Sequence, residues 1–219
     1  MTERIRERHP MKVVHLLRHG EVWNPDHILY GRLDGFPLSP RGEEQAKAAT
    51  EYLATRDIGF LVSSPLERAV QTARPVGELF GLSTYLDVRL IEAENKLQGR
   101  QVAGGKALLA DPRNWRHFVN PLRPSWGEPY IDIAIRVLAA ARAARDHAGD
   151  TAEAVCVSHQ LPIVAARRYV EGRPLAHDPR RRRCALASVT SLTFSGDVVV
   201  RVDYAEPAGA TPAESVAGA

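Results

Sequence analysis

Val13-Val14-His15-Leu16-Leu17-Arg18-His19-Gly20-Glu21 is an apolar run that ends abruptly in an arginine, a histidine and a glycine. Its first part, 13–17, predicts a strand buried on both faces, which is typical of a parallel sheet. Open α/β sheets bind ligands at the carboxyl ends of their strands, and Arg18 and His19 lie at such an end. We expect Gly20 to let the backbone turn sharply without a Cβ clash, so that the ring of His19 points into a crevice.

Outward from this stretch, strand-like and helix-like segments alternate along the chain. Further strands are predicted at 60–62, 84–87 and 154–157, and an antiparallel hairpin at 189–194 and 198–204. Helices are predicted over about 40–56, from just after Ser63 with the capping box Ser64-Pro65-Leu66-Glu67, over 131–147, and from Pro162 to about 170. This alternation predicts an α/β fold, a three-layer sandwich whose mostly parallel sheet has an antiparallel edge hairpin and helices on both faces.

The length of 219 residues suits one domain. We expect a charged N-terminal extension over 1–10, a domain over 11–205, and a disordered tail over 206–219 with little apolar bulk. Residues 99–130 break the alternation and contain several prolines. We interpret this segment as an irregular insertion over the active site, because long irregular segments in compact domains tend to be functional.

Composition argues against several classes of protein. Hydrophobic residues make up 44% and charged residues 25%, the balance of a soluble globular chain. The net charge of +3 is mild, and the run Arg180-Arg181-Arg182-Arg183 has no interleaved aromatic residues, so we interpret it as solvated surface and expect no nucleic-acid partner. Without a signal core or a run of membrane-spanning length, we expect no membrane partner and a cytoplasmic location. Cys156 and Cys184 are expected to be reduced core residues.

Cationic or potentially cationic side chains follow three of the predicted strands. Arg18 and His19 follow the first, Arg68 lies near the start of the helix after the second, and His159 follows strand 154–157. A parallel sheet would gather these ends at one edge. Guanidinium groups and helix N-termini neutralise phosphate oxygens, so the sequence predicts a phosphate pocket there. His15, inside the first strand, we interpret as a core histidine.

Four motifs resemble those of the histidine phosphatase superfamily, in its phosphoglycerate mutase-like branch. They occur in the family's order and are Arg18-His19-Gly20, the loop Gly31-Arg32-Leu33-Asp34-Gly35-Phe36-Pro37-Leu38-Ser39, Ser63-Ser64-Pro65-Leu66-Glu67-Arg68-Ala69, and Val157-Ser158-His159. The similarity extends from about Val13 to Phe194. It implies a nucleophilic histidine at His19, with Arg18, Arg68 and His159 forming the phosphate pocket.

The resemblance also implies a carboxylic acid soon after Asp87-Val88-Arg89-Leu90, where Glu92 stands and Glu94 is a rival. Members often have a phosphate-binding asparagine after the first motif; Asn24 is the candidate, although its spacing is one residue short. Arg32 is a candidate substrate contact, which its glycine-rich turn explains equally well on structural grounds. Gln160 stands where glycine is common and would narrow the pocket or add an amide to it. Glu128 would cap the following helix or brace Arg18.

These residues lead to the hypothesis of a metal-independent phosphatase that acts on a phosphomonoester of a small metabolite. Neutral His19 would attack phosphorus, Glu92 would protonate the departing alkoxide, and Glu92 would then activate the water that hydrolyses the phosphohistidine. We expect no cofactor and no metal, because no Asp/His cluster at ligand spacing accompanies the motifs. The alternatives are phosphoglycerate mutase-type phosphoryl transfer, whose Glu-Arg-x-Tyr-Gly signature is missing, and a non-catalytic phosphate-binding interaction protein. A homo-oligomer is possible, and the sequence does not identify the substrate.

Overall fold

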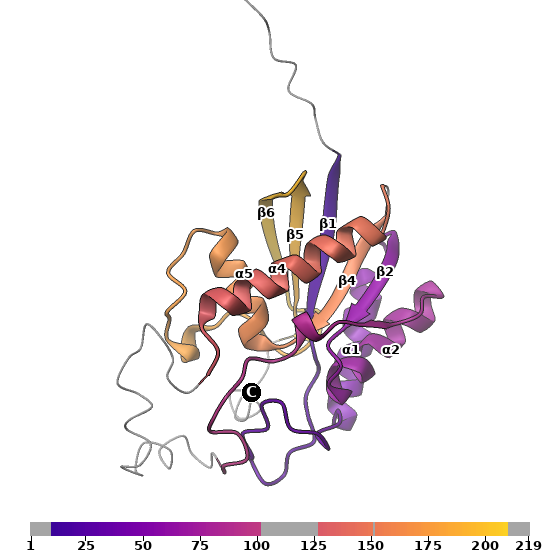
Figure 1. Cartoon of the computed structure of the whole chain (residues 1–219). Coiled ribbons are helices and arrows are strands. Elements are labelled where there is room, and N and C mark those ends of the chain that lie inside the picture. The colour runs from indigo at the N-terminus through magenta and orange to yellow at the C-terminus, as the bar shows by residue number, and fades with distance from the viewer. Residues whose placement is uncertain (1–9, 102–126, 151, 210–219) are drawn as a thin grey trace, which may run out of the picture.

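The computed structural model describes residues 10–101, 127–150 and 152–209 of the chain. Strands and helices alternate through most of this length, as Figure 1 shows. In chain order they are β1 (Met11–Arg18), α1 (Pro40–Leu53), β2 (Ile58–Ser63), α2 (Glu67–Phe80), β3 (Tyr85–Leu86), the 3₁₀ turn η1 (Val88–Leu90), α4 (Tyr130–His147), β4 (Glu153–Ser158), α5 (Gln160–Val170), the 3₁₀ turn η3 (Pro179–Arg181), β5 (Val189–Ser195) and β6 (Val198–Ala205).

The strands form one six-stranded sheet in the order β3-β2-β4-β1-β5-β6. β3, β2, β4 and β1 pair in parallel, whereas β5 pairs antiparallel with both β1 and β6. The near-continuous apolar runs of β1 and β4 lie in the middle of this sheet, where both of their faces are covered. The predicted mostly parallel sheet with an antiparallel edge hairpin is confirmed.

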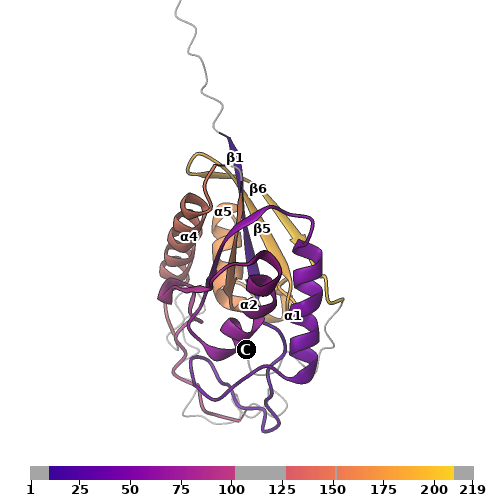
Figure 2. The same ribbon diagram turned by 90° about the vertical axis from the view of Figure 1, so that its right-hand side faces the viewer.

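Helices cover both faces of the sheet, and each face has its own apolar core. Figure 2 shows α1 on one side and α4 on the other, with the strands between them. Successive residues of β1 point to opposite faces. Leu16 therefore packs in the cluster that contains Ile133 of α4, whereas Leu17 packs in the cluster that contains Leu53 of α1. The three-layer sandwich is confirmed.

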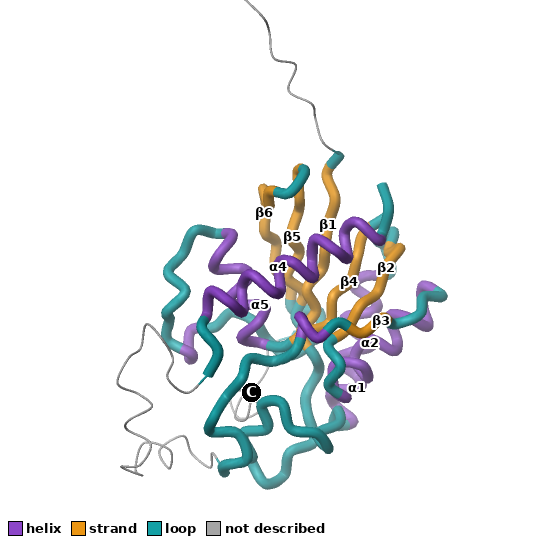
Figure 3. The backbone as a smooth tube through the Cα atoms, viewed as in Figure 1, coloured by secondary structure: helices purple, strands orange, loops and turns teal. Residues whose placement is uncertain are grey.

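The register of the parallel strands brings their carboxyl ends to one level. Arg18 at the end of β1 is paired with Ser158 at the end of β4, and Ser63 at the end of β2 is paired with Val157. Figure 3 shows that the loops leaving these strands gather at this edge of the sheet. His19, Ser64 and His159, each one residue beyond a strand, therefore start from neighbouring positions.

Two helix starts differ from the sequence-based expectation. α2 begins at Glu67, and its N-cap residue Leu66 has no side-chain cap, so the predicted capping box is wrong. The Ser64 hydroxyl lies 2.8 Å from Nε2 of His159 instead, which diverts it from the cap. α5 begins at Gln160, before Pro162, so that this helix starts directly after His159.

The ends of the domain lie partly outside the described residues. Residues 206–209, predicted to belong to the tail, form a turn in which the Gly209 amide donates to the Glu206 carbonyl at 3.0 Å, and Ala208 packs against the core cluster under α1 and α2. Positions 1–9 of the N-terminal extension, 102–126 of the insertion and 210–219 of the tail lie outside the described residues. Over the described ranges, no helix combines the length and the apolar character needed to cross a bilayer.

Candidate active site

His19 is fully buried directly after β1, and its surroundings fix its tautomer. Its Nδ1 lies 2.7 Å from the carbonyl oxygen of Gly20. Because a carbonyl can only accept, Nδ1 holds the hydrogen and Nε2 presents a lone pair. Burial, Arg68 and Arg18 together hold the pKa of His19 well below its ordinary value. The ring is therefore neutral near pH 7, as a nitrogen nucleophile must be.

Two buried arginines flank this ring, and each is anchored through one nitrogen. Arg18 Nη1 donates to the Cys184 carbonyl at 2.7 Å, and Arg68 Nη2 donates to the Gly31 carbonyl at 2.6 Å. The Arg68 guanidinium also lies over the ring of Tyr30, 4.7 Å from its centroid. Each anchor fixes a guanidinium group and leaves other N–H groups of the same side chain for a ligand.

His159 stands beside His19, with ring centroids 5.1 Å apart. Its Nε2 contacts the Ser64 hydroxyl, which also lies 3.4 Å from the Leu66 amide as an acceptor. Burial is the main cause that lowers the pKa of His159, with Arg68 and His19 adding to it. His159 is therefore a second neutral imidazole in the site.

Five buried nitrogen atoms of these residues have no hydrogen-bond partner among the described residues. They are Nε and Nη2 of Arg18, Nε2 of His19, Nε of Arg68 and Nδ1 of His159. Buried polar groups in native proteins are almost always paired, so such a cluster marks a place built for a ligand. We call Arg18, His19, Arg68 and His159 the phosphate pocket.

Glu92 is the buried carboxyl group of this site. It is 6% exposed, whereas its rival Glu94 is exposed at the surface. Burial is the largest influence on Glu92 and raises its pKa, although the Ala93 amide, Arg68 and Arg18 oppose that rise. Both pocket arginines therefore act on the charge of the Glu92 carboxyl group. A carboxyl group with a raised pKa can hold a proton for a leaving group.

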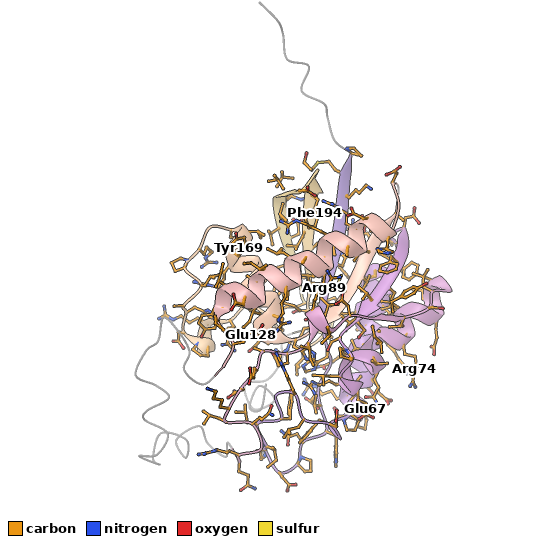
Figure 4. The ribbon with its side chains drawn as sticks, in the orientation of Figure 1. Glu67, Arg74, Arg89, Glu128, Tyr169 and Phe194 are labelled. Carbon is orange, nitrogen blue, oxygen red and sulfur yellow. The ribbon has the colours of Figure 1, made fainter. Side chains whose placement is uncertain are left out.

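Three further charged residues hold the backbone that carries Glu92. Arg32 Nε donates to the Glu92 carbonyl at 2.7 Å. Arg136 Nη1 donates to the carbonyl groups of Arg89 and Ile91, at 2.6 and 2.7 Å. Glu128, just before α4 (Figure 4), joins the two arginines. Its carboxylate accepts from Arg136 Nε at 2.7 Å and from Arg32 Nη2 at 3.1 Å. We call Arg32, Glu128 and Arg136 the acid-loop clamp.

The clamp bears on two expectations from the sequence. Arg32, a candidate substrate contact, commits Nε and Nη2 to the clamp. Glu128 neither caps α4, whose N-cap is Pro129, nor braces Arg18. Arg136 was missed altogether because it is one of several arginines on the predicted helix 131–147, and the sequence does not show which of them faces the loop.

Two glycines allow close backbone approaches around the site. A Cβ on Gly127 would lie 2.2 Å from the Glu94 carbonyl oxygen, so only glycine lets the segment before α4 pair with the loop after Glu92. A Cβ on Gly20 would lie 2.4 Å from the Gly42 carbonyl oxygen. Glycine is thus required at position 20 because the loop after β1 packs closely against α1, and not because of the sharp turn that we expected.

Asn24 lies outside the phosphate pocket. Its amide nitrogen donates to the Ile28 carbonyl and its amide oxygen accepts from the Ile28 amide, both at 2.9 Å. With both groups committed, Asn24 closes its own loop and lines a cavity of about 520 Å³. Tyr30 lines the same cavity and also packs edge-on to His19, with centroids 6.4 Å apart, so cavity and pocket share this ring as a wall.

The remaining predictions from single residues have mixed outcomes. His15 lies between the Ser191 hydroxyl and the Glu153 carboxylate, at 2.8 and 2.6 Å, as a hydrogen-bonded core residue. Cys156 and Cys184 are buried and free, as expected. The prediction that the arginine run is wholly solvated is wrong at Arg182, whose half-buried side chain donates to His177 Nε2 and to the Gln160 side-chain oxygen, at 3.0 and 3.2 Å. Among the residues that the structure describes, no group of three or more His, Cys, Asp or Glu side chains could hold a metal ion.

The chain also matches a protein-family model over most of its length. The model described as histidine phosphatase superfamily (branch 1) matches residues 14–206. That range contains every residue of the phosphate pocket and of the acid-loop clamp, as well as Glu92.

Similar proteins extend over most of the chain. "Uncharacterized protein Rv0525" of Mycobacterium tuberculosis (strain ATCC 25618 / H37Rv) is 52% identical over 195 residues, which cover 89% of this chain and 96% of that protein. "Probable phosphoglycerate mutase GpmB" of Enterobacter sp. (strain 638) is 31% identical over 190 residues, covering 84% of this chain and 86% of that protein. The native structure of mycobacterial glucosyl-3-phosphoglycerate phosphatase Rv2419c matches with a TM-score of 0.69 and 29% identity, covering 89% of this chain and 97% of that one.

Proposed function

Since the chain belongs to the histidine phosphatase superfamily, we propose that it is a phosphatase that hydrolyses a phosphomonoester of a small metabolite through a phosphohistidine at His19. The observation that supports this proposal most directly is the cluster of buried, unpartnered nitrogens in the phosphate pocket. One of them is the lone-pair nitrogen of the expected nucleophile. In our proposal the other four bind phosphate oxygens.

In the first step, Nε2 of His19 attacks phosphorus and the bond from phosphorus to the ester oxygen breaks. Glu92 gives its proton to that oxygen, so the product leaves as an alcohol. In the second step, a water molecule attacks the phosphohistidine while Glu92 takes up one of its protons. The phosphorus–nitrogen bond breaks, phosphate leaves, and both His19 and Glu92 return to their starting protonation states.

The rest of the pocket stabilises the charge on the transferring group. The free N–H groups of Arg18 and Arg68 would bind its oxygens as charge-assisted hydrogen bonds. In our proposal Ser64 accepts from the Leu66 amide and donates to His159 Nε2, so that His159 Nδ1 holds a hydrogen for a third oxygen. These donors are fixed before the ligand arrives, which is what makes such stabilisation effective.

Phosphoglycerate mutase-type transfer is the second candidate, because a relative named "Probable phosphoglycerate mutase GpmB" is 31% identical. A mutase returns the phosphoryl group to the substrate, whereas a phosphatase gives it to water. The two reactions are distinguished by incubating the protein with 3-phosphoglycerate and with p-nitrophenyl phosphate. A phosphatase releases inorganic phosphate, and a mutase forms 2-phosphoglycerate with little phosphate release.

Replacement of the nucleophile tests the proposal itself. His19→Ala should lower phosphate release from p-nitrophenyl phosphate by about 10⁴-fold or more, because the covalent route is then lost. His147→Ala is the matched control, since His147 is an exposed histidine at the end of α4, and its activity should equal that of the wild type. Normal turnover by the His19→Ala variant would refute the assignment of His19 as the nucleophile.

A further inference from the structure

The turn after β1 carries the proposed nucleophile, and side chains of two helices hold its backbone. The Gly20 amide donates to the Thr72 hydroxyl of α2 at 3.1 Å, and the Glu21 amide donates to the Gln45 side-chain oxygen of α1 at 2.8 Å. Both of these side chains are buried. We call residues 19–21 the nucleophile turn. Each of the two contacts fixes the plane of one of its peptide units.

The contact with Gln45 acts on the peptide unit that the nucleophile itself uses. Because the peptide bond is planar, the carbonyl of one residue and the amide of the next turn together. The Gly20 carbonyl and the Glu21 amide belong to one such unit. Gln45 accepts from its amide, and Nδ1 of His19 donates to its carbonyl at 2.7 Å. Holding the amide therefore fixes the direction of the carbonyl that selects the tautomer of His19.

Thr72 acts on a different peptide unit. The Gly20 amide that donates to it shares its unit with the His19 carbonyl, and that carbonyl accepts from the Ala187 amide at 3.2 Å. Both ends of this unit are therefore bound to groups other than the imidazole. Gln45 is thus the side chain whose contact reaches the acceptor of the ring.

The helix that carries Gln45 is itself fixed against the nucleophile turn. The Ser39 amide donates to the Glu21 carbonyl and the Ser39 hydroxyl donates to the Glu21 carboxylate, both at 2.9 Å. Ser39 is also the N-cap of α1, where its hydroxyl accepts from the Gly42 amide at 3.0 Å. Gln45 lies one turn beyond Gly42 on the same face of the helix. α1 therefore presents the Gln45 oxygen to the turn as a fixed acceptor.

From this geometry we infer that Gln45 is a positioning residue, which keeps His19 in the tautomer with its hydrogen on Nδ1 by holding the peptide unit between Gly20 and Glu21. The inference rests on the proposed function, in which Nε2 of His19 is the nucleophile. Accepting from the amide also makes the carbonyl of the same unit a stronger acceptor, because linked hydrogen bonds polarise one another. Without Gln45 the unit is free to rotate, and the tautomer with hydrogen on Nε2 becomes populated. In that tautomer Nε2 has no lone pair with which to attack phosphorus.

The test removes the acceptor and reads the tautomer directly. Gln45→Met keeps the length of the side chain without its oxygen, whereas Gln45→Glu retains an acceptor oxygen. Gln71→Met is the matched control, because the Gln71 side-chain oxygen accepts from the Leu38 amide at 2.7 Å, in the same loop but outside the nucleophile turn. The ring nitrogens of His19 are observed near neutral pH by NMR of protein with isotope-labelled histidine, and are assigned by comparison with His19→Ala.

The wild type, Gln71→Met and Gln45→Glu should all have hydrogen on Nδ1 of His19 and none on Nε2. Gln45→Met should show the other tautomer, and its first-turnover release of p-nitrophenol from p-nitrophenyl phosphate should slow by about 10- to 100-fold, the effect of losing one buried hydrogen bond. The inhibition constant of inorganic phosphate should stay close to that of the wild type, because the pocket arginines are unchanged. Gln45→Leu removes the acceptor with another shape and replaces Gln45→Met in the test should that variant not fold.

A merely structural role would lower the midpoint of thermal unfolding in Gln45→Met and Gln71→Met alike and leave the tautomer of His19 unchanged. That result would overturn the inference, as would hydrogen on Nε2 in the wild type. If the wild type still hydrolyses p-nitrophenyl phosphate, the phosphatase proposal then stands. Failure of the proposed function gives a different result, because the wild type would release no p-nitrophenol while the NMR measurement would still report whether the tautomer depends on Gln45.

Discussion

The phosphate pocket and the acid-loop clamp are both built from buried or half-buried ionisable side chains, but their hydrogen-bonding groups are used in opposite ways. In the pocket, each of the four residues has at least one side-chain nitrogen without a hydrogen-bond partner among the described residues. In the clamp, Glu128 binds both arginines, and these bind the carbonyls of the loop that carries Glu92. The pocket keeps its donors for a ligand, whereas the clamp uses its donors to fix geometry.

This difference has an energetic consequence. A desolvated cation without an anionic partner opposes folding, whereas a fully satisfied polar network makes the local structure rigid. We therefore expect the pocket to contribute activity at the expense of stability, and the clamp to contribute to both. Glu92 connects the two regions, because both pocket arginines act on the charge of its carboxyl group and its backbone is held by the clamp.

The largest effect on activity is expected from Glu92→Gln, at the residue that connects the pocket and the clamp. This variant keeps the shape of the side chain but cannot transfer a proton. The kcat for an alkyl phosphate should fall by about 10²- to 10⁴-fold. Formation of the phosphohistidine should be impaired less with p-nitrophenyl phosphate, whose leaving group does not need a proton, so a burst of p-nitrophenol should precede slow hydrolysis. Glu94→Gln is the control and should behave as the wild type. If Glu94→Gln shows the burst and Glu92→Gln does not, the two assignments must be exchanged.

A pocket variant should separate activity from stability. Arg68→Gln removes a buried cation next to His19 and should lower kcat/KM by about 10²- to 10³-fold, because the transferring group loses a fixed donor. Its midpoint of thermal unfolding without phosphate should not fall. Inorganic phosphate should raise the midpoint of the wild type and raise that of the variant much less. A variant that is inactive because it is poorly folded would contradict the contrast between the regions.

A variant of the clamp should lower both the activity and the stability of the protein. Arg136→Lys keeps the charge but loses the planar set of donors that spans Glu128 and two carbonyl groups. The kcat should fall by about 10- to 100-fold with little change in KM, because a displaced acid is misplaced in the transition state. The free energy of unfolding should fall by about 1–3 kcal/mol. Arg142→Lys, on the same helix with one long bond to the Asp197 carbonyl, should alter neither. A change confined to KM would refute the positioning role.

The smallest effect is expected in the pH dependence. Because the pKa of His19 is lowered, the rise of kcat/KM with pH should lie below the range of an ordinary histidine. The raised pKa of Glu92 should place the fall of activity above the range of an ordinary carboxyl group. In Arg68→Gln the rising limb should move to higher pH, since a positive charge that disfavours protonation of His19 is removed. A shift to lower pH would contradict this electrostatic account.

The residues of the phosphate pocket could be predicted from the sequence, whereas those of the acid-loop clamp could not. Arg18, His19 and His159 stand at or next to strand ends, and Arg68 lies in the first turn of the helix after β2. Apolar runs with parallel pairing are sufficient to predict that these strand ends meet. Arg18, His19, Arg68 and His159 could thus be named from the chain alone. The competition between Glu92 and Glu94 could not be decided that way, because their difference lies in burial, which tertiary packing determines.

The clamp was beyond sequence reasoning for a physical reason. Its residues come from a loop, the end of an insertion and a helix face, and no local pattern relates Arg32 to Arg136. Their partners are largely backbone carbonyls, which every residue possesses. Ser64 shows a related limit: its capping-box spacing is correct, but the chain uses the hydroxyl for His159 instead. Arg182 likewise differs from its neighbours in the run only through its folded contacts.

The central claim is that Nε2 of His19 becomes phosphorylated, and trapping that species tests it most directly. Glu92→Gln should be mixed with p-nitrophenyl phosphate, quenched in alkali within its first turnover, digested and analysed by mass spectrometry. The account predicts a phosphorylated peptide with the phosphate on Nε2 of His19, stable to alkali and lost in acid. Turnover without any such species, or with the phosphate on His159, would contradict it.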